Sequence, residues 1–240
     1  MEDPILTITL PRLVISFVPA VAVVGIMWWW ALSAGTAVYG LARMLIQLLM
    51  IGFLLTLIFE TDQALVVSAV LAVMLLVAAW IAMRPLAAKA RRQYGLALIA
   101  IAVGGISTLS LITGLVLNLD PWFMPRYMVP IAGMIFAGSM NAVSLAAERF
   151  ASEREAGNPA EQARRSAMEA ALIPVMNSLF AVGLVSLPGM MTGQILAGTS
   201  PLVAVRYQVV VMCMLFGAAG LSVAIYLALA VTRSRHHAAT

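Results

Sequence analysis

Charged residues are scarce in this sequence: Asp, Glu, Lys and Arg make up only 10% of its 240 residues. An ordinary soluble domain has about 25% charged residues. Hydrophobic residues account for 63% of the chain, and the mean hydropathy is +1.02. The 14 basic and 10 acidic residues are too few to cover the exterior of a water-soluble domain of this size. The composition therefore excludes a soluble protein and predicts a membrane protein surrounded mostly by lipid.

Residues that carry common chemistry are scarce as well. The single cysteine, Cys213, excludes an internal disulfide. The single lysine, Lys89, is not part of a Gly-x-x-x-x-Gly-Lys-Ser/Thr motif, so any ATP hydrolysis is expected on a partner chain. The long apolar runs contain no acidic residue and no histidine, which argues against an intramembrane enzyme. The acidic start of the chain, residues 1–4, predicts that no signal peptide is cleaved and that the first apolar run stays as a span.

Seven apolar runs are long enough to cross a hydrocarbon layer about 30 Å thick. They cover residues 13–32, 38–59, 64–83, 96–119, 128–147, 171–187 and 202–231. The predicted fold is therefore all-α: a polytopic membrane protein of about seven transmembrane helices in a single domain over residues 1–240. The sixth run stops at Pro188, where the missing N–H should end or kink a helix. Residues 188–198 are predicted to form a Pro/Gly-broken or re-entrant segment.

The distribution of basic residues predicts the orientation. With the N-terminus outside and the C-terminus inside, 11 of the 14 basic residues fall on the inner face. The three that fall outside are Arg12, Arg126 and Arg206. The reverse orientation would invert this ratio, so the positive-inside rule favours N-out/C-in, with residues 232–240 as a cytoplasmic tail. The net charge of +4 is explained by this bias and requires no nucleic-acid partner.

One long polar stretch, residues 148–169, separates the fifth and sixth runs and contains nine charged residues. Residues 156–160 (AGNPA) predict a turn, and residues 160–171 are rich in helix formers. The pattern indicates a short cytoplasmic helix that leads directly into the sixth span. From the charge pattern alone, a solvated hairpin that merely joins two spans is the simpler interpretation.

Several short motifs carry a resemblance to a known family. They are RMLIQ at 43–47, PIAGM at 130–134, ALIPVMNS at 171–178, VGLVSLPGMMTGQILAG at 182–198, SPL at 200–202 and RYQ at 206–208. Together they make the chain similar to the FetB-type permease family, which includes plant aluminium-tolerance relatives, over residues 38–231. The motif around residues 185–198 is the most specific of the set.

The resemblance implies the membrane subunit of an ABC transporter, located in the cell (inner) membrane and paired with a separate ATPase that holds ATP and Mg²⁺. No cofactor is expected on this chain itself. Bacterial members are linked to iron export and plant members to UDP-glucose transport, so both a metal and a non-metal solute such as a nucleotide sugar remain open. A homodimer is expected, since one chain with one coupling loop offers half of a symmetric machine. A non-transporting scaffold that recruits a soluble partner is a further alternative.

The resemblance also places the ATPase-coupling loop at residues 148–169, although the loop is shorter here by about one helical turn. The predicted coupling residues are Glu153, Glu155, Gly157, Arg164, Arg165 and Glu169.

Candidate transport-path or gate residues are polar positions within the apolar runs and residues of the Pro/Gly-broken segment at 188–198. They are Arg43, Gln47, Asn141, Asn177, Pro188, Gly189, Met190, Met191 and Gln194. Each has a simpler interpretation. Arg43 can reach the headgroups from the end of its helix, and the amides can bond neighbouring helices.

The sequence shows no high-affinity iron cage. Glu60, Asp62 and Asp120 are the candidate metal residues, because they could form an acidic mouth on the outer side. Ordinary charges of outside-facing loops are the simpler interpretation. The two histidines, His236 and His237, lie in the predicted C-terminal tail.

Overall fold

The computed structural model describes the backbone of residues 8–238 and the side chains within that range except those of 87–90 and 234–238. The described chain is helical and divides into two compact units, one ending at Glu60 and one beginning at Thr61. Whether the two units act as one permease domain, as the sequence predicts, stays a prediction.

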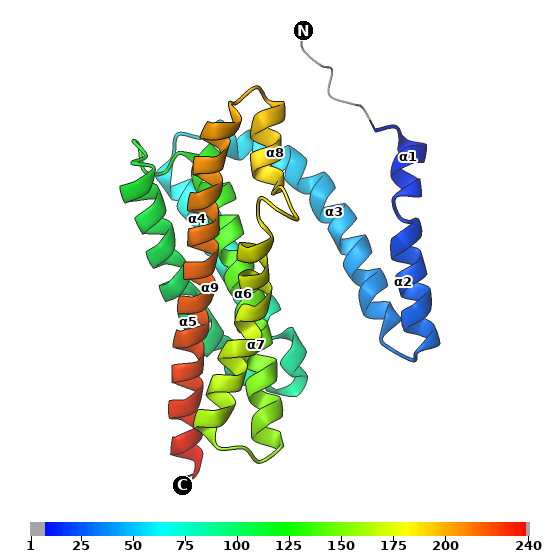
Figure 1. Ribbon diagram of the computed structural model, residues 1–240, viewed down its shortest axis with the longest axis vertical. Helices are drawn as coiled ribbons and strands as arrows, with labels where there is room; N and C mark the ends of the chain where they lie inside the picture. The colour runs from blue at the N-terminus through cyan, green and yellow to red at the C-terminus, as the bar shows by residue number, and fades with distance from the viewer. Residues whose placement is uncertain (1–7, 239–240) are drawn as a thin grey trace. The chain divides into compact units, whose positions relative to one another are not determined.

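The first unit contains the helices α1 (Leu10–Ile15), α2 (Val18–Trp29) and α3 (Ala34–Phe59). α2 and α3 form an antiparallel pair (Figure 1). The first predicted span is broken between α1 and α2, because Pro19 has no N–H to donate to the carbonyl of Ile15. α3 begins earlier than the sequence predicts and ends at Phe59, as expected.

The second unit is a bundle built around two long central helices, α6 and α9. Its elements in chain order are α4 (Ala64–Ala82), the 3₁₀ turn η1 (Arg84–Lys89), α5 (Ala90–Leu111), the π-helical η2 (Ile112–Val116), α6 (Pro125–Glu155), α7 (Ala160–Ala181), α8 (Gly189–Leu196) and α9 (Pro201–Ala238). α6 packs against α4, α5, α7 and α9, and its inner face buries Ile135, Phe136, Val143 and Ala146. The core of this unit is therefore the surface that α6 and α9 share.

α5 and α9 cross at very short range because small residues face each other. A Cβ atom at Gly104 would lie 2.5 Å from Ser222 Oγ and 2.7 Å from the Ser222 backbone nitrogen. No real side chain tolerates contacts that short, so glycine at this position is what allows the two backbones to approach.

Six helices among the described residues are long and apolar enough to cross a membrane, not the seven that the sequence predicts. The missing one is the predicted sixth span, residues 171–187. Its expected end is wrong: α7 ends at Ala181, because the chain then forms a tight loop in which Gly183 has φ 81° and its N–H donates to the carbonyl of Ser186 (2.9 Å). The apolar part of α7 that follows Glu169 is therefore too short to span the membrane by itself.

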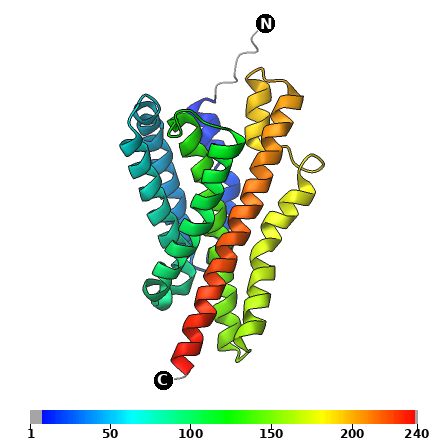
Figure 2. The same ribbon diagram turned by 90° about the vertical axis from the view of Figure 1, so that its left-hand side faces the viewer.

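The direction of the helices shows how the chain nevertheless returns. α6 and α9 both run from the upper to the lower end of the second unit (Figures 1 and 2). The chain must therefore climb back between Glu155 and Pro201, and it does so through α7, the irregular residues 182–188 and α8. The predicted broken segment at 188–198 contains a short regular helix, α8, which packs against α9.

Two helices are longer than their apolar runs. α6 has 31 residues, which corresponds to about 46 Å of helix against a hydrocarbon layer of about 30 Å. Its charged final turns and the charged first half of α7 thus form a helical hairpin beyond the apolar zone, joined by a turn at residues 156–159. α9 continues through Ala238, so most of the predicted tail at 232–240 is helical, and residues 239–240 lie outside the described range.

Candidate functional site

A cavity with a volume of about 870 Å³ lies between α6, α7 and α9 in the second unit. Its upper wall includes Ser186, Pro188 and Gly189, and its lower end includes Glu148 and Ala171. Along α6 the lining extends from Met134 to Glu148, a distance of about 21 Å. The cavity thus covers much of the thickness of the bundle and ends where the charged hairpin begins.

The walls are mostly apolar, with a few uncharged polar side chains. These are Asn141, Ser144, Ser178, Ser186 and Gln208. Gln208 is only 5% exposed, yet its Oε1 accepts no hydrogen bond from any described residue. Buried side-chain oxygens of this kind nearly always have a partner. Gln208 Oε1 is therefore a buried acceptor behind the wall of the cavity that no described residue satisfies.

The charge on the described lining of the cavity is negative only. Glu148 is the one charged residue among the described residues that line it, and no arginine or lysine contributes to the wall. Three methionines, Met134, Met190 and Met212, supply soft, polarizable surface. The electrostatic character of this site is weakly negative at its lower end and neutral elsewhere.

The predicted path residues divide into three groups. Asn141, Pro188, Gly189 and Met190 line the cavity. Asn177, Met191 and Gln194 lie on the same elements, α7 and α8, but do not line it. Arg43 and Gln47 belong to the first unit, and their side chains pair with each other: with the Gln47 amide oxygen turned toward Arg43, it accepts from Nη2 at 3.2 Å and Nε at 3.1 Å.

The predicted path residues omit five polar or charged residues of the cavity: Ser144, Glu148, Ser178, Ser186 and Gln208. Gln47 and Gln208 both lie in apolar runs and in family-like motifs, but only Gln47 is among the predicted path residues. Glu148 was read as the first residue of the polar loop, and its place at the foot of the cavity follows from the continuity of α6 through the loop boundary.

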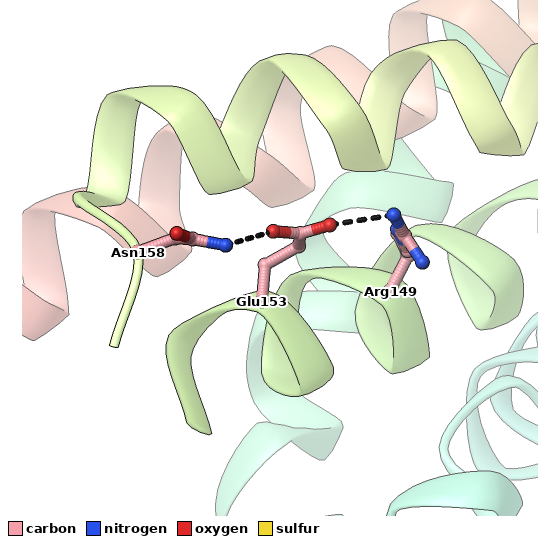
Figure 3. A network of polar contacts seen from close by, with 3 residues as sticks. All are labelled: Arg149, Glu153 and Asn158. Carbon is pink, nitrogen blue, oxygen red and sulfur yellow. Dashed lines mark hydrogen bonds and ion pairs between the residues drawn. The ribbon is translucent and has the colours of Figure 1, made fainter. Parts of the chain in front are cut away.

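The hairpin between α6 and α7 is held by a small polar network (Figure 3). Glu153 accepts from Arg149 Nη2 at 2.6 Å and from the side-chain amide of Asn158. Arg154 Nη1 donates to the carbonyl oxygen of Asn158 at 2.6 Å. The last turns of α6 are thereby tied to the loop that enters α7.

The other predicted coupling residues lie on the same hairpin. Gly157 has φ 85°, a backbone conformation that glycine adopts without strain. Arg164 pairs with Glu161 at 2.7 Å on the exposed surface, and Arg165 and Glu169 are exposed. All of these residues thus occupy one polar element, which is contiguous with the two helices that line the cavity.

The described residues contain no group of three or more His, Cys, Asp or Glu side chains that could hold a metal ion. Glu60 ends the first unit, Asp62 lies just after it in the second, and Asp120 precedes α6 in a separate loop. Their suggested role as an acidic mouth stays a prediction. The side chains of His236 and His237 lie outside the described set.

The described chain is a polytopic helical membrane protein whose cavity-lining helices continue into a charged hairpin. The chain belongs to the family described as Uncharacterised protein family (UPF0014), which matches residues 10–158 and 155–234. It is a multi-pass membrane protein of this permease-like family, as the sequence motifs predict.

Curated relatives extend over most of the chain. The UPF0014 membrane protein slr1647 of Synechocystis is 37% identical over 210 residues, which is 80% of each chain. The probable iron export permease protein FetB of Escherichia coli is 36% identical over 199 residues, 77% of this chain and 75% of the relative. The protein ALUMINUM SENSITIVE 3 of Arabidopsis thaliana is 36% identical over 206 residues, 78% and 73% of the two chains. No solved structure matches the chain.

Proposed function

We propose that this chain is the membrane-spanning permease subunit of an ABC transporter that exports a divalent metal such as iron. ATP and Mg²⁺ are held and ATP is hydrolysed by a separate cytoplasmic ATPase subunit. The observation that carries the proposal is the charge of the cavity: one carboxylate, Glu148, and no basic side chain among the described lining residues. The 36% identity to the probable iron export permease supports the same function.

The cavity chemistry favours a cation over a nucleotide sugar. A diphosphate carries negative charge that becomes costly when it leaves water, and proteins offset this cost with arginine or lysine. Here the described lining offers a carboxylate instead, which would repel a diphosphate and attract a cation. We therefore rank the metal above the nucleotide sugar as substrate.

The same lining argues for a hydrated ion rather than a tightly ligated one. Glu148 and Asn141 offer oxygen acceptors at separate places on α6. Divalent metals that keep part of their water shell are bound through hydrogen bonds from that water. Weak binding suits transport, because a site must release its ion as readily as it takes it up.

Coupling to ATP hydrolysis would pass through the hairpin. α7 is one continuous helix: Glu161, Arg164 and Arg165 lie in its polar first half, and Pro174 and Ser178 line the cavity in its second half. A force applied to the hairpin by a closing ATPase would therefore move a wall of the cavity directly. In this proposal the C-terminus and the hairpin are cytoplasmic, the chain crosses seven times through six helices and the broken α7–α8 crossing, and two copies assemble.

The test is ATPase activity of the complex in nanodiscs. The chain is co-expressed with its cognate ATPase, and hydrolysis is measured with Fe²⁺, other divalent metals and UDP-glucose. Fe²⁺ should stimulate hydrolysis, and Glu148→Gln should raise the half-maximal Fe²⁺ concentration about fivefold, the effect of losing roughly 1 kcal/mol of attraction.

Glu161→Gln is the matched control, since it removes the same charge from the exposed hairpin outside the cavity. If UDP-glucose alone stimulated ATP hydrolysis, the proposed substrate would be a nucleotide sugar and not a metal. Failure to form a complex with any ATPase would leave a membrane scaffold as the better description.

A further inference from the structure

A second pocket, with a volume of about 420 Å³, lies near the lower end of the bundle between α5, α6 and α9. Its charged residues are Arg92, Arg154, Arg233 and Glu155. Three guanidinium groups against one carboxylate give the lining an excess of positive charge. It shares no lining residue with the large cavity.

Apart from Gln93, the uncharged lining of the pocket is aliphatic or aromatic. Ala147, Phe150 and Ala230 are buried, and Tyr226 is only 1% exposed. The pocket therefore combines a positively charged mouth with an apolar floor. This combination fits an amphipathic ligand better than a fully hydrated anion.

Two of the guanidinium groups are held in place by backbone carbonyls. Arg233 Nη1 donates to the carbonyl oxygen of Arg92 at 2.8 Å, which links α9 to α5. Arg154 Nη1 donates to the carbonyl oxygen of Asn158 at 2.6 Å, at the end of α6. A guanidinium carries several N–H donors in one plane, and each of these carbonyl bonds fixes the position of one of its nitrogens.

We propose that this pocket binds the phosphate group of an anionic phospholipid in the inner leaflet. The pocket lies where α5, α6 and α9 pass from their apolar to their basic turns, which is the depth of lipid headgroups when the basic ends face the cytoplasm. The phosphate diester meets the three arginines, and the glycerol and first methylenes lie over Phe150 and Tyr226. The bound lipid joins the foot of the coupling hairpin to α5 and α9.

The experiment measures binding of phosphatidylglycerol to the purified full chain in detergent, by native mass spectrometry and by thermal unfolding. The double variant Arg92→Gln/Arg233→Gln should weaken binding at least about tenfold, because each basic residue near a headgroup contributes on the order of 1 kcal/mol. Arg91→Gln/Arg165→Gln is the matched control: it removes the same charge from exposed arginines outside the pocket and should leave binding within about twofold.

Further measurements distinguish a lipid phosphate from free phosphate, and a loss of charge from a loss of folding. Zwitterionic phosphatidylcholine should bind far more weakly than phosphatidylglycerol, and inorganic phosphate should not compete at millimolar concentration. Arg92→Lys/Arg233→Lys, which keeps the charge, should recover part of the affinity. The proposal would be overturned if both double glutamine variants lost phosphatidylglycerol binding equally, or if the two lipids bound equally well. If inorganic phosphate saturated the pocket and added lipid had no further effect on thermal unfolding, the pocket would be a site for free phosphate. That result would overturn the lipid proposal.

Discussion

The large cavity and the basic pocket are walled by the same two helices, α6 and α9, yet they have opposite chemistry. On α9 both sites use one face: Gln208 and Leu215 line the cavity, and Tyr226 and Arg233 line the pocket further along the same stripe. The face of the helix is therefore not what separates the two sites. The depth at which each residue lies decides whether that face is neutral or basic.

α6 behaves differently from α9. Asn141 and Glu148 face the cavity on the α7 side, whereas Phe150 and Arg154 face the pocket on the α5 side. α6 is thus a wall between a site of negative charge and a site of positive charge. Substitutions on its two faces should affect one site and spare the other.

Reversing the charge of the cavity should have the largest effect. Glu148→Arg replaces an attraction for a cation with a repulsion, and we expect the half-maximal Fe²⁺ concentration for ATPase stimulation to rise by more than about tenfold. Phosphatidylglycerol binding to the same variant, measured by native mass spectrometry, should change by less than about twofold, since Glu148 does not line the basic pocket. A variant that lost both responses equally would show that the two sites are not independent.

Disturbing the α5–α9 crossing should come next. Gly104→Ala places a methyl group against the Ser222 backbone, and we expect a loss of about 1–3 kcal/mol in unfolding free energy. Thermal unfolding in detergent measures this loss, and stabilisation by phosphatidylglycerol should fall with it because α5 and α9 both wall the pocket. Gly95→Ala on the same helix meets nothing within 4 Å. Because Ala is the better helix former, this control should be neutral or slightly stabilising. A comparable loss in the control would mean that the close crossing is not responsible.

Loosening the hairpin network should affect coupling more than fold. Glu153→Ala removes the acceptor shared by Arg149 and Asn158, at a cost of about 1 kcal/mol for a charged but partly exposed contact. Fe²⁺ stimulation of the complex should decrease while its basal hydrolysis persists. Glu161→Ala removes an exposed pair with Arg164 and should cost less than about 0.5 kcal/mol. Equal coupling defects in both variants would contradict a specific role for the network.

The smallest effect is expected at the hairpin turn. Gly157 has φ 85°, and Gly157→Ala should cost about 1 kcal/mol through backbone strain. A loss of this size in a chain of 240 residues should lower the melting temperature by only a few degrees. Gly189→Ala, at a helical position with open space around it, should leave the melting temperature unchanged. A large shift in that control would indicate that α8 packs more tightly than its surroundings suggest.

Hydropathy predicted the helices of both units well, because runs of apolar residues and helix length are governed by the same bilayer thickness. It failed where helices and apolar runs diverge. α6 continues to Glu155 because charged residues are good helix formers once the helix leaves the apolar zone. α7 ends at Ala181 although the sequence stays apolar, because the loop around Gly183 closes through local hydrogen bonds that hydropathy cannot detect.

The site was predictable only in part for a related reason. The stretch from Pro188 to Met190 was found through its motif, and Asn141 through its polarity in an apolar run; all of these residues line the cavity. Gln208 was missed because its importance depends on burial without a partner, which only the packing of α9 reveals. The pocket formed by Arg92, Arg154 and Arg233 was missed because these arginines come from three distant segments and were read only as an orientation signal.

The most direct test of the proposed function is ATP-driven transport in inside-out proteoliposomes that contain the chain and its cognate ATPase. The account predicts that labelled Fe²⁺ accumulates in the lumen when ATP is added outside, and that Glu148→Gln slows the initial rate at subsaturating Fe²⁺ about fivefold while Glu161→Gln does not. Accumulation of UDP-glucose with no movement of Fe²⁺ would contradict the assignment of this chain to metal export.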